Sequence, residues 1–296
     1  MSIPLPDPMR TANRRGVLAM SAGMCSFVIN DSLVKYVSES LPGTQLIFIR
    51  GVFATLLVLA IVRASGQLKQ ARLLAERKVV LRAVLDALAT MTYLTSLFHL
   101  PIANATAINM ATPLFITLFA VIAFHERVRA RRWVAIATGF VGVLLVVQPS
   151  TAGFNAYSLL CLGGTLLHAS RDLMTRRIDP RVPSLLITLS TAVAVSLLSG
   201  GMGLVAADWQ PVSTRNFALL ALASVFLSGG YYLLTVAMRN GEMSLVAPFR
   251  YIGLLFAILL GFFVWGDVPN LLAWVGIALV VGAGLAVLHG ERQARQ

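Results

Sequence analysis

Two aspartates lie inside segments of this chain that are otherwise apolar enough to cross a lipid bilayer. Asp31 lies near the end of the apolar run 17–34, and Asp172 follows it by 141 positions in a second such run. A charged group in hydrocarbon is costly, and by default it marks a substrate or ion pathway and has a partner. The other charged groups that we place inside apolar segments are Arg50, Asp86, Arg171 and Arg250. These residues predict a polar site within a membrane.

Depth along the segments predicts which charges meet. Asp31 lies about 22 Å along a segment that begins near residue 16, and Arg50 lies about 9 Å along the returning segment that begins near residue 44. These depths agree, so we expect an Asp31–Arg50 pair towards one face of the membrane. Asp172 and Arg250 form the corresponding expected pair towards the other face. Both pairs are candidates for gates, and the alternative is that they are static ion pairs between helices.

Polar and aromatic residues well inside the segments complete the predicted substrate pocket. They are Asn30, Tyr93, Asn109, Ser228, Tyr231, Tyr232, Tyr251 and Trp265. Asp86 is a further pocket candidate, and Arg82, one turn away, is expected to extend its side chain to the membrane surface. We interpret His168 as a satisfied polar residue rather than a proton carrier.

The composition defines the elements that must position these residues. The 296-residue chain is 57% hydrophobic and 12% charged, whereas a soluble globular chain carries about 25% charge. A membrane-spanning helix needs about 20 apolar residues, so this length predicts an all-α integral membrane protein with ten transmembrane helices. The two cysteines, Cys25 and Cys161, fall inside apolar runs, and we expect no disulfide.

The expected spans follow one another with short connections. They are 16–35, 44–63, 79–98, 102–124, 132–148, 155–175, 183–204, 216–237, 243–265 and 270–289. The segments 1–15 and 290–296 are expected to be cytoplasmic tails. Most of the 24 lysines and arginines fall in alternate connections and in the tails, which predicts that both chain ends are cytoplasmic. The net charge of +12 is therefore a topology signal and does not indicate a nucleic-acid partner.

The second half of the sequence repeats the first. The shift that superimposes the two aspartates also places Pro42 on Pro183 and Trp133 on Trp274. The repeats are 16–148 and 155–289, and because each holds five spans, the second must be inverted relative to the first. Inverted repeats are typical of secondary transporters, whose substrate site lies between the repeats near the middle of the membrane.

The motifs resemble one transporter family. Asn30-Asp31-Ser32 near the end of the first span, the single Arg50, the stretch Ala111–Phe115 and the stretch Phe124–Arg127 resemble the drug/metabolite transporter superfamily, EamA type. The resemblance covers nearly the whole chain and is nearest in character to bacterial aromatic-amino-acid exporters. It implies transport of a small metabolite such as an amino acid, nucleobase or cofactor across a bacterial inner membrane.

These observations favour a secondary transporter that exports amino acids by alternating access. Import of another metabolite, such as a nucleobase, a cofactor or a solute like S-adenosylmethionine, is the alternative. A membrane-embedded transferase would need a carboxylate pair or histidine cluster at the cytoplasmic surface, and the loops are too short to hold one. We find neither metal-ligand spacing nor a nucleotide-binding motif, and we expect no enzyme activity and no cofactor. The expected partners are the lipid bilayer and a small-molecule substrate, while proton coupling and the choice between monomer and homodimer stay open.

Overall fold

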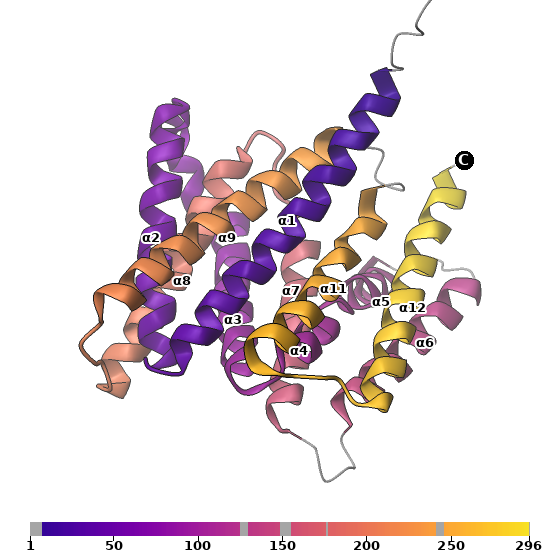
Figure 1. Ribbon diagram of the computed structural model, residues 1–296. Coiled ribbons are helices and arrows are strands. Elements are labelled where there is room, and N and C mark those ends of the chain that lie inside the picture. The colour runs from indigo at the N-terminus through magenta and orange to yellow at the C-terminus, as the bar shows by residue number, and fades with distance from the viewer. Residues whose placement is uncertain (1–7, 125–129, 149–154, 176, 241–245, 296) are drawn as a thin grey trace, which may run out of the picture.

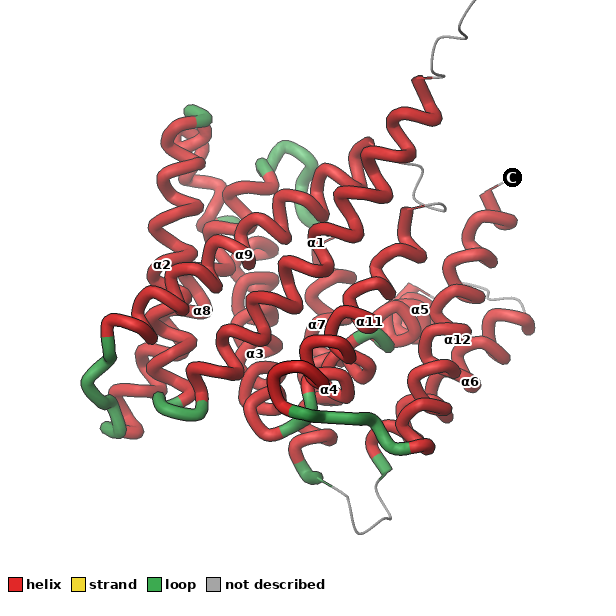
Figure 2. The backbone as a smooth tube through the Cα atoms, in the orientation of Figure 1, coloured by secondary structure: helices red, strands yellow, loops and turns green. Residues whose placement is uncertain are grey.

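The computed structural model describes residues 8–124, 130–148, 155–175, 177–240 and 246–295. The regular elements in these ranges are all helical (Figures 1 and 2). The first half contains α1 (Pro8–Ser38), α2 (Gly43–Ala64), η1 (Gln67–Ala75), α3 (Arg77–His99), α4 (Ile102–Asn109), α5 (Thr112–Phe124) and α6 (Ala130–Val147). The second half contains α7 (Tyr157–Thr175), α8 (Ser184–Ala206), α9 (Thr214–Asn240), η2 (Ala247–Tyr251), α11 (Ile252–Leu260), η3 (Gly261–Trp265) and α12 (Leu271–Arg295).

Helix extends into both segments that the sequence predicts as tails. α1 begins at Pro8, and proline is well tolerated in the first turn of a helix because its missing N–H has no partner there. α12 continues to Arg295 through a stretch rich in good helix formers. The predicted breaks at 126–132, 149–153 and 240–241 lie wholly or partly outside the described residues.

The fourth span is broken between α4 and α5 in the first half of the chain, and its equivalent in the second half begins with a 3₁₀ segment. In the first half α4 ends at Asn109, because Pro113 lacks the N–H that would bond the Asn109 carbonyl. The Thr112 hydroxyl donates to that carbonyl instead, at 2.6 Å. In the second half Arg250 holds the position equivalent to Asn109, and there the 3₁₀ segment η2 precedes α11. Broken spans of this kind are tolerated where they line a cavity.

The two halves run in opposite directions. α1 begins at the end of the bundle where α12 finishes, which we call the proximal end, and it finishes at the distal end (Figure 1). Lys35 near the end of α1 donates to the carbonyls of Leu97 and Leu100, so α3 also finishes at the distal end. Asn155, just before α7, donates to the carbonyl of His99 at 3.0 Å. α7, the first helix of the second half, therefore starts at the distal end, whereas α1, its equivalent in the first half, starts at the proximal end. The two repeats are thus inverted relative to each other.

Helix packing follows the same internal symmetry. α1 packs against α9 as α3 packs against α7, and α2 packs against α9 as α8 packs against α3. The contacts α2–α8 and α6–α12 each join a helix to its own equivalent in the other repeat, so exchange of the repeats leaves them unchanged. Between α6 and α12 the contact is close, since a Cβ on Gly142 would lie 2.8 Å from the Gly276 carbonyl oxygen.

The outer surface of the bundle suits a lipid environment. Among the described residues, five helices are long and apolar enough to cross a membrane, within 14–38, 43–64, 77–99, 184–206 and 214–234, and four shorter apolar helices accompany them. Large side chains such as Leu204, 76% exposed, point outwards and would be an aggregation hazard in water. The prediction of an all-α integral membrane protein is confirmed.

Candidate functional site

A cavity of about 270 Å³ lies between the two halves of the chain. This volume is near the lower end of the range for ligand pockets, about 300–1,000 Å³. Ten of the residues predicted for the pocket line the cavity: Asn30, Asp31, Arg50, Asp86, Tyr93, Asn109, Asp172, Ser228, Tyr231 and Arg250. They come from seven elements, namely α1, α2, α3, α4, α7, α9 and η2.

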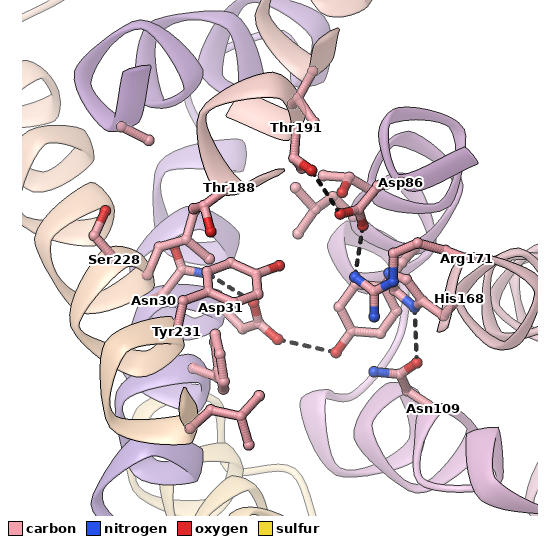
Figure 3. Close-up of a pocket in the computed structure, with 18 of the residues that line it drawn as sticks. Asn30, Asp31, Asp86, Asn109, His168, Arg171, Thr188, Thr191, Ser228 and Tyr231 are labelled. Carbon is pink, nitrogen blue, oxygen red and sulfur yellow. Dashed lines mark hydrogen bonds and ion pairs between the residues drawn. The ribbon is translucent and has the colours of Figure 1, made fainter. Parts of the chain in front are cut away.

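An ion-pair network forms one wall of the cavity (Figure 3). Arg171 Nη1 of α7 lies 2.7 Å from Asp86 Oδ1 of α3, and Arg82 Nη1 lies 3.3 Å from Asp86 Oδ2. Arg171 Nη2 lies 2.9 Å from Asp172 Oδ1. Two carboxylates and two guanidinium groups thus balance one another, and the network joins the first half of the chain to the second.

Hydroxyl and amide groups complete this network. Thr191 Oγ1 donates to Asp86 Oδ2 at 3.1 Å, and Arg82 Nε donates to Thr175 Oγ1 at 3.1 Å. His168 Nδ1 lies 3.0 Å from Asn109 Oδ1. Buried polar groups that are partnered in this way hold one geometry, because any displacement would leave a group unsatisfied. We therefore interpret the network as a positioning element.

Asp31 lies across the cavity from this network and has neutral partners (Figure 3). Asn30 Nδ2 donates to Asp31 Oδ1 at 2.9 Å, and the Tyr93 hydroxyl donates to Asp31 Oδ2 at 3.0 Å. Arg50 Nη1 donates to Asn30 Oδ1 at 3.3 Å. One carboxamide group therefore links the guanidinium of Arg50 to the carboxylate of Asp31.

The two predicted gate pairs are not direct ion pairs in this structure. Asp31 and Arg50 are close enough for their charges to interact, but the ion pairs among the described residues do not join them, because Asn30 lies between. Asp172 pairs with Arg171, its neighbour in sequence, instead of Arg250. Arg250 lines the cavity and has no ion-pair partner within the part of the chain that the structure describes.

Apolar and hydroxyl groups from α9 form a further wall. Ser228 and Tyr231 face the cavity in Figure 3, and Phe27 packs edge-on against Tyr231 with ring centroids 5.1 Å apart. Leu227 and Leu234 add hydrocarbon surface. The cavity thus offers charges of both signs beside an apolar wall. In the described residues, no group of three or more His, Cys, Asp or Glu side chains is placed to hold a metal ion.

Three predicted pocket residues lie elsewhere. The side chain of Tyr232 is 68% exposed on the outer surface, because adjacent residues of a helix point in directions about 100° apart. Tyr251 is 7% exposed, and its hydroxyl lies where a side chain on Gly284 would collide with it. Trp265 Nε1 donates to Glu39 Oε1 at 2.9 Å at the distal end.

Arg171, Arg82 and His168 are lining residues that the pocket prediction leaves out. Arg82 is buried and turns inwards, contrary to the expectation that it reaches the membrane surface, since Asp86 and two threonines supply its partners. The internal repeat could have predicted that Arg171 and His168 line the cavity. The shift places Arg171 on Asn30 and His168 on Phe27, both of which line the cavity.

Side-chain hydrogen bonds cross the distal end of the bundle. Gln45 Nε2 donates to the Gln210 carbonyl at 2.7 Å, and Arg215 Nη2 donates to the Tyr36 hydroxyl at 2.9 Å. Lys35 faces the Trp265 ring at 5.4 Å in addition to its bonds to the end of α3. The cavity, by contrast, extends towards the proximal end, as residues such as Arg82 and Leu234 show.

Comparisons with known proteins agree on the family. Residues 14–148 and 155–288 match the EamA-like transporter family. The chain is 27% identical to the pseudopaline exporter of Pseudomonas aeruginosa, over 94% of this chain and 98% of that protein. It is 29% identical to a riboflavin transporter of Vibrio cholerae, over 90% of each. It is 24% identical to an S-adenosylmethionine uptake transporter of Rickettsia prowazekii, over 92% of this chain and 94% of that protein.

A solved crystal structure shares the fold. It superimposes with a TM-score of 0.62 at 16% identity and covers 93% of this chain and 99% of that one. At this identity the similarity concerns the arrangement of helices alone.

Proposed function

Since the chain belongs to the EamA-like transporter family, we propose that it is a secondary transporter that exports amino acids or chemically similar small metabolites across a bacterial inner membrane. It is a multi-pass membrane protein whose relatives are transporters of small metabolites. In this proposal the units 16–148 and 155–289 rock against each other and expose the cavity to one side of the membrane at a time.

The observation that carries the proposal is the position of the cavity. It lies between the inverted repeats, beside the broken fourth span, and it is lined by Asp31, Arg50 and Arg250 in addition to the closed ion-pair network. Charged residues at this depth are costly and mark a solute pathway. In a purely structural protein, charged groups that line a cavity without a direct ionic partner would be destabilising and would serve no function.

The chemistry of the wall favours an amino acid as substrate. Carboxylate and guanidinium groups on one side suit a solute that carries both charges, and Phe27, Leu227 and Leu234 offer hydrocarbon contact to its side chain. The relatives are named for different solutes and for both directions of transport, so substrate and direction are proposed from the cavity and from the sequence.

The direction of transport depends on the orientation in the membrane. The alternation of positive loops favours a cytoplasmic position for both chain ends, which places the proximal end in the cytoplasm. The distal end is crossed by hydrogen bonds and the cavity reaches towards the proximal end, so this conformation faces inwards. An exporter loads its substrate in this state. Uptake is the second candidate, because relatives include S-adenosylmethionine uptake transporters.

Efflux and uptake in cells separate the two directions. Cells that express the chain and are preloaded with radiolabelled L-phenylalanine should release it faster than cells with an empty vector. They should show no faster uptake of radiolabelled S-adenosylmethionine or riboflavin. Accelerated uptake of either solute with unchanged amino-acid efflux would overturn export and establish the second candidate.

A further inference from the structure

The cavity wall contains pairs of positions that the internal repeat superimposes. With the shift of 141 positions, Asn30 corresponds to Arg171, Arg50 to Thr191, and Asp86 to Leu227. All six residues line the cavity. The helices that carry them also pack equivalently, since α8 lies against α3 as α2 lies against α9. The two sets therefore form two versions of one site, and they can be compared residue by residue.

The first version is complete within the protein. The carboxylate of Asp86 accepts a bond from Arg171 at 2.7 Å and a bond from Thr191 at 3.1 Å. The exposed fraction of Asp86 is 1%, so its negative charge is buried and directly compensated. A cation, a hydroxyl and a carboxylate thus close the site without any ligand.

The second version has its cation but no carboxylate. Asn30 stands in place of Arg171, Arg50 in place of Thr191, and the hydrocarbon side chain of Leu227 in place of the Asp86 carboxylate. Arg50 is 3% exposed, its Nε is buried without a hydrogen-bond partner, and its Nη1 makes only a 3.3 Å bond to a neutral amide. A buried cation without a direct anion is destabilising. The missing group is an anion beside Leu227.

We propose that the carboxylate of the substrate completes this second version. It binds Arg50 in the space beside Leu227, at the position that corresponds to the carboxylate of Asp86. This inference rests on the proposed function, because it takes the cavity to be the substrate site. Arg250 also lines the cavity, but it is only partly buried, so water can satisfy it and Arg50 is the cation that requires the ligand.

The neighbouring Asp31 extends the inference to the positive group of the substrate. Asp31 accepts bonds from Asn30 and Tyr93, both neutral, and each carboxylate oxygen retains capacity for a further donor. One carboxamide separates Asp31 from Arg50, and in an α-amino acid the ammonium and carboxylate groups are attached to the same carbon. A zwitterion would neutralise both residues at once, whereas a simple anion would leave Asp31 without a cation. The ligand class is therefore a solute with a carboxylate next to a cationic group.

Stability measurements test the carboxylate position without any substrate. Leu227→Asp places an internal carboxylate at the position proposed for the carboxylate of the substrate, and Leu227→Asn is the matched neutral control. We expect the purified Leu227→Asp protein to melt at a higher temperature than Leu227→Asn. The difference should disappear when both are combined with Arg50→Met. If Leu227→Asp melts no higher than Leu227→Asn while Arg50 is present, the proposed position is wrong.

Analogue competition in the wild-type protein tests the ligand class and does not depend on those variants folding. The probes are L-phenylalanine, L-phenylalaninamide, which lacks the carboxylate charge, and 3-phenylpropanoate, which lacks the ammonium group. Both analogues should compete at least about tenfold more weakly than the amino acid. In Arg50→Lys, which keeps the charge but loses the fork of donors, the amino acid should bind more weakly than in the wild type. Equal competition by L-phenylalanine and its amide would overturn the inference.

The two experiments distinguish the inference from the proposed function. If amino acids are transported but L-phenylalanine and L-phenylalaninamide compete equally, the proposed carboxylate position is wrong and the transporter proposal is unaffected. If no amino acid is transported but Leu227→Asp stabilises the protein through Arg50, the proposed carboxylate position is supported and the proposal of amino-acid export is wrong.

Discussion

Arg171 bonds Asp86 across the boundary between the two repeats, with Nη1 2.7 Å from Oδ1. Asp86 belongs to α3 of the first repeat and Arg171 to α7 of the second, and both side chains are largely buried. The pair therefore fixes how two helices from different repeats meet at the cavity wall. Because Arg82, Asp172 and Thr191 share in the same network, we infer that this contact between α3 and α7 stabilises the arrangement of the two repeats seen in this conformation.

Breaking this pair should destabilise the protein strongly. Arg171→Met leaves the Asp86 carboxylate with only part of its compensation, and removing one partner of a buried pair costs about 3–5 kcal/mol. Arg171→Met combined with Asp86→Leu should cost less than Arg171→Met alone, since the remaining charges of the network, Arg82 and Asp172, then balance each other in number. The melting temperature of the purified protein in detergent measures both, and a double variant that is less stable than either single variant would contradict the network.

An exposed pair of the same length provides the control. Arg181 Nη2 lies 2.7 Å from Asp179 Oδ2 in the connection before α8. Hydrogen bonds from Arg181 lower the pKa of Asp179 to about 2, so this pair is ionised at neutral pH. Solvent screens it, and Arg181→Ala should leave the melting temperature unchanged. A shift as large as that of Arg171→Met would show that burial is not the cause of the effect.

Asp31 and Arg50 should be energetically coupled through Asn30. Arg50→Leu alone removes the cation whose charge interacts with Asp31 through Asn30, so it should reduce folding or transport more than Arg50→Leu combined with Asp31→Asn. The coupling free energy from this double-mutant cycle should be about 0.5–3 kcal/mol. It should decrease in an Asn30→Ala background, because the carboxamide link is lost. Strictly additive effects would reject the coupling.

Lys35 should hold the distal end closed. Its ammonium group bonds the last carbonyls of α3 and faces Trp265, and Lys35→Met removes both contacts. A single cysteine at Ser228, in a protein whose Cys25 and Cys161 are replaced by serine and alanine, should then react faster with a membrane-impermeant maleimide added from the distal side. Lys69→Met, at an exposed position of η1, serves as the control. Unchanged labelling after Lys35→Met would show that other contacts keep this end closed.

The orientation of the chain in the membrane can be read from reporter fusions. The alternation of positive loops predicts that Asn155 lies outside the cytoplasm and Arg131 inside it. Alkaline phosphatase fused after Asn155 should therefore be active, and the same enzyme fused after Arg131 should be inactive. The opposite pattern would reverse the membrane orientation proposed for the proximal and distal ends.

The helices and the location of the site can be predicted from the sequence because a bilayer restricts which backbone structures can span it. Each apolar run long enough to span must be a helix, and the constant shift between the halves predicts inversion. Polar residues inside such runs are costly to expose to lipid and therefore face the interior of the bundle. Asn30, Asn109 and Ser228 all line the cavity for this reason.

Individual partners could not be predicted in this way. Depth along a span is known to a few ångströms, but it does not distinguish Arg171 from Arg250 as the partner of Asp172, since both reach the cavity. Residue type alone does not separate Tyr231 from Tyr232, of which one faces the cavity and the other the outer surface. These choices depend on side-chain direction and on the rotation of each helix, which hydrophobicity does not encode where a whole run is apolar.

Counterflow in proteoliposomes tests directly whether the protein transports amino acids through a site that contains Arg50. Vesicles that contain the purified protein are loaded with an unlabelled L-amino acid, diluted into the same labelled amino acid, and followed over time. The account predicts transient accumulation of label for at least one amino acid, and loss of that accumulation in Arg50→Met. Vesicles that accumulate no amino acid from a full panel, while riboflavin or S-adenosylmethionine exchanges readily, would contradict it.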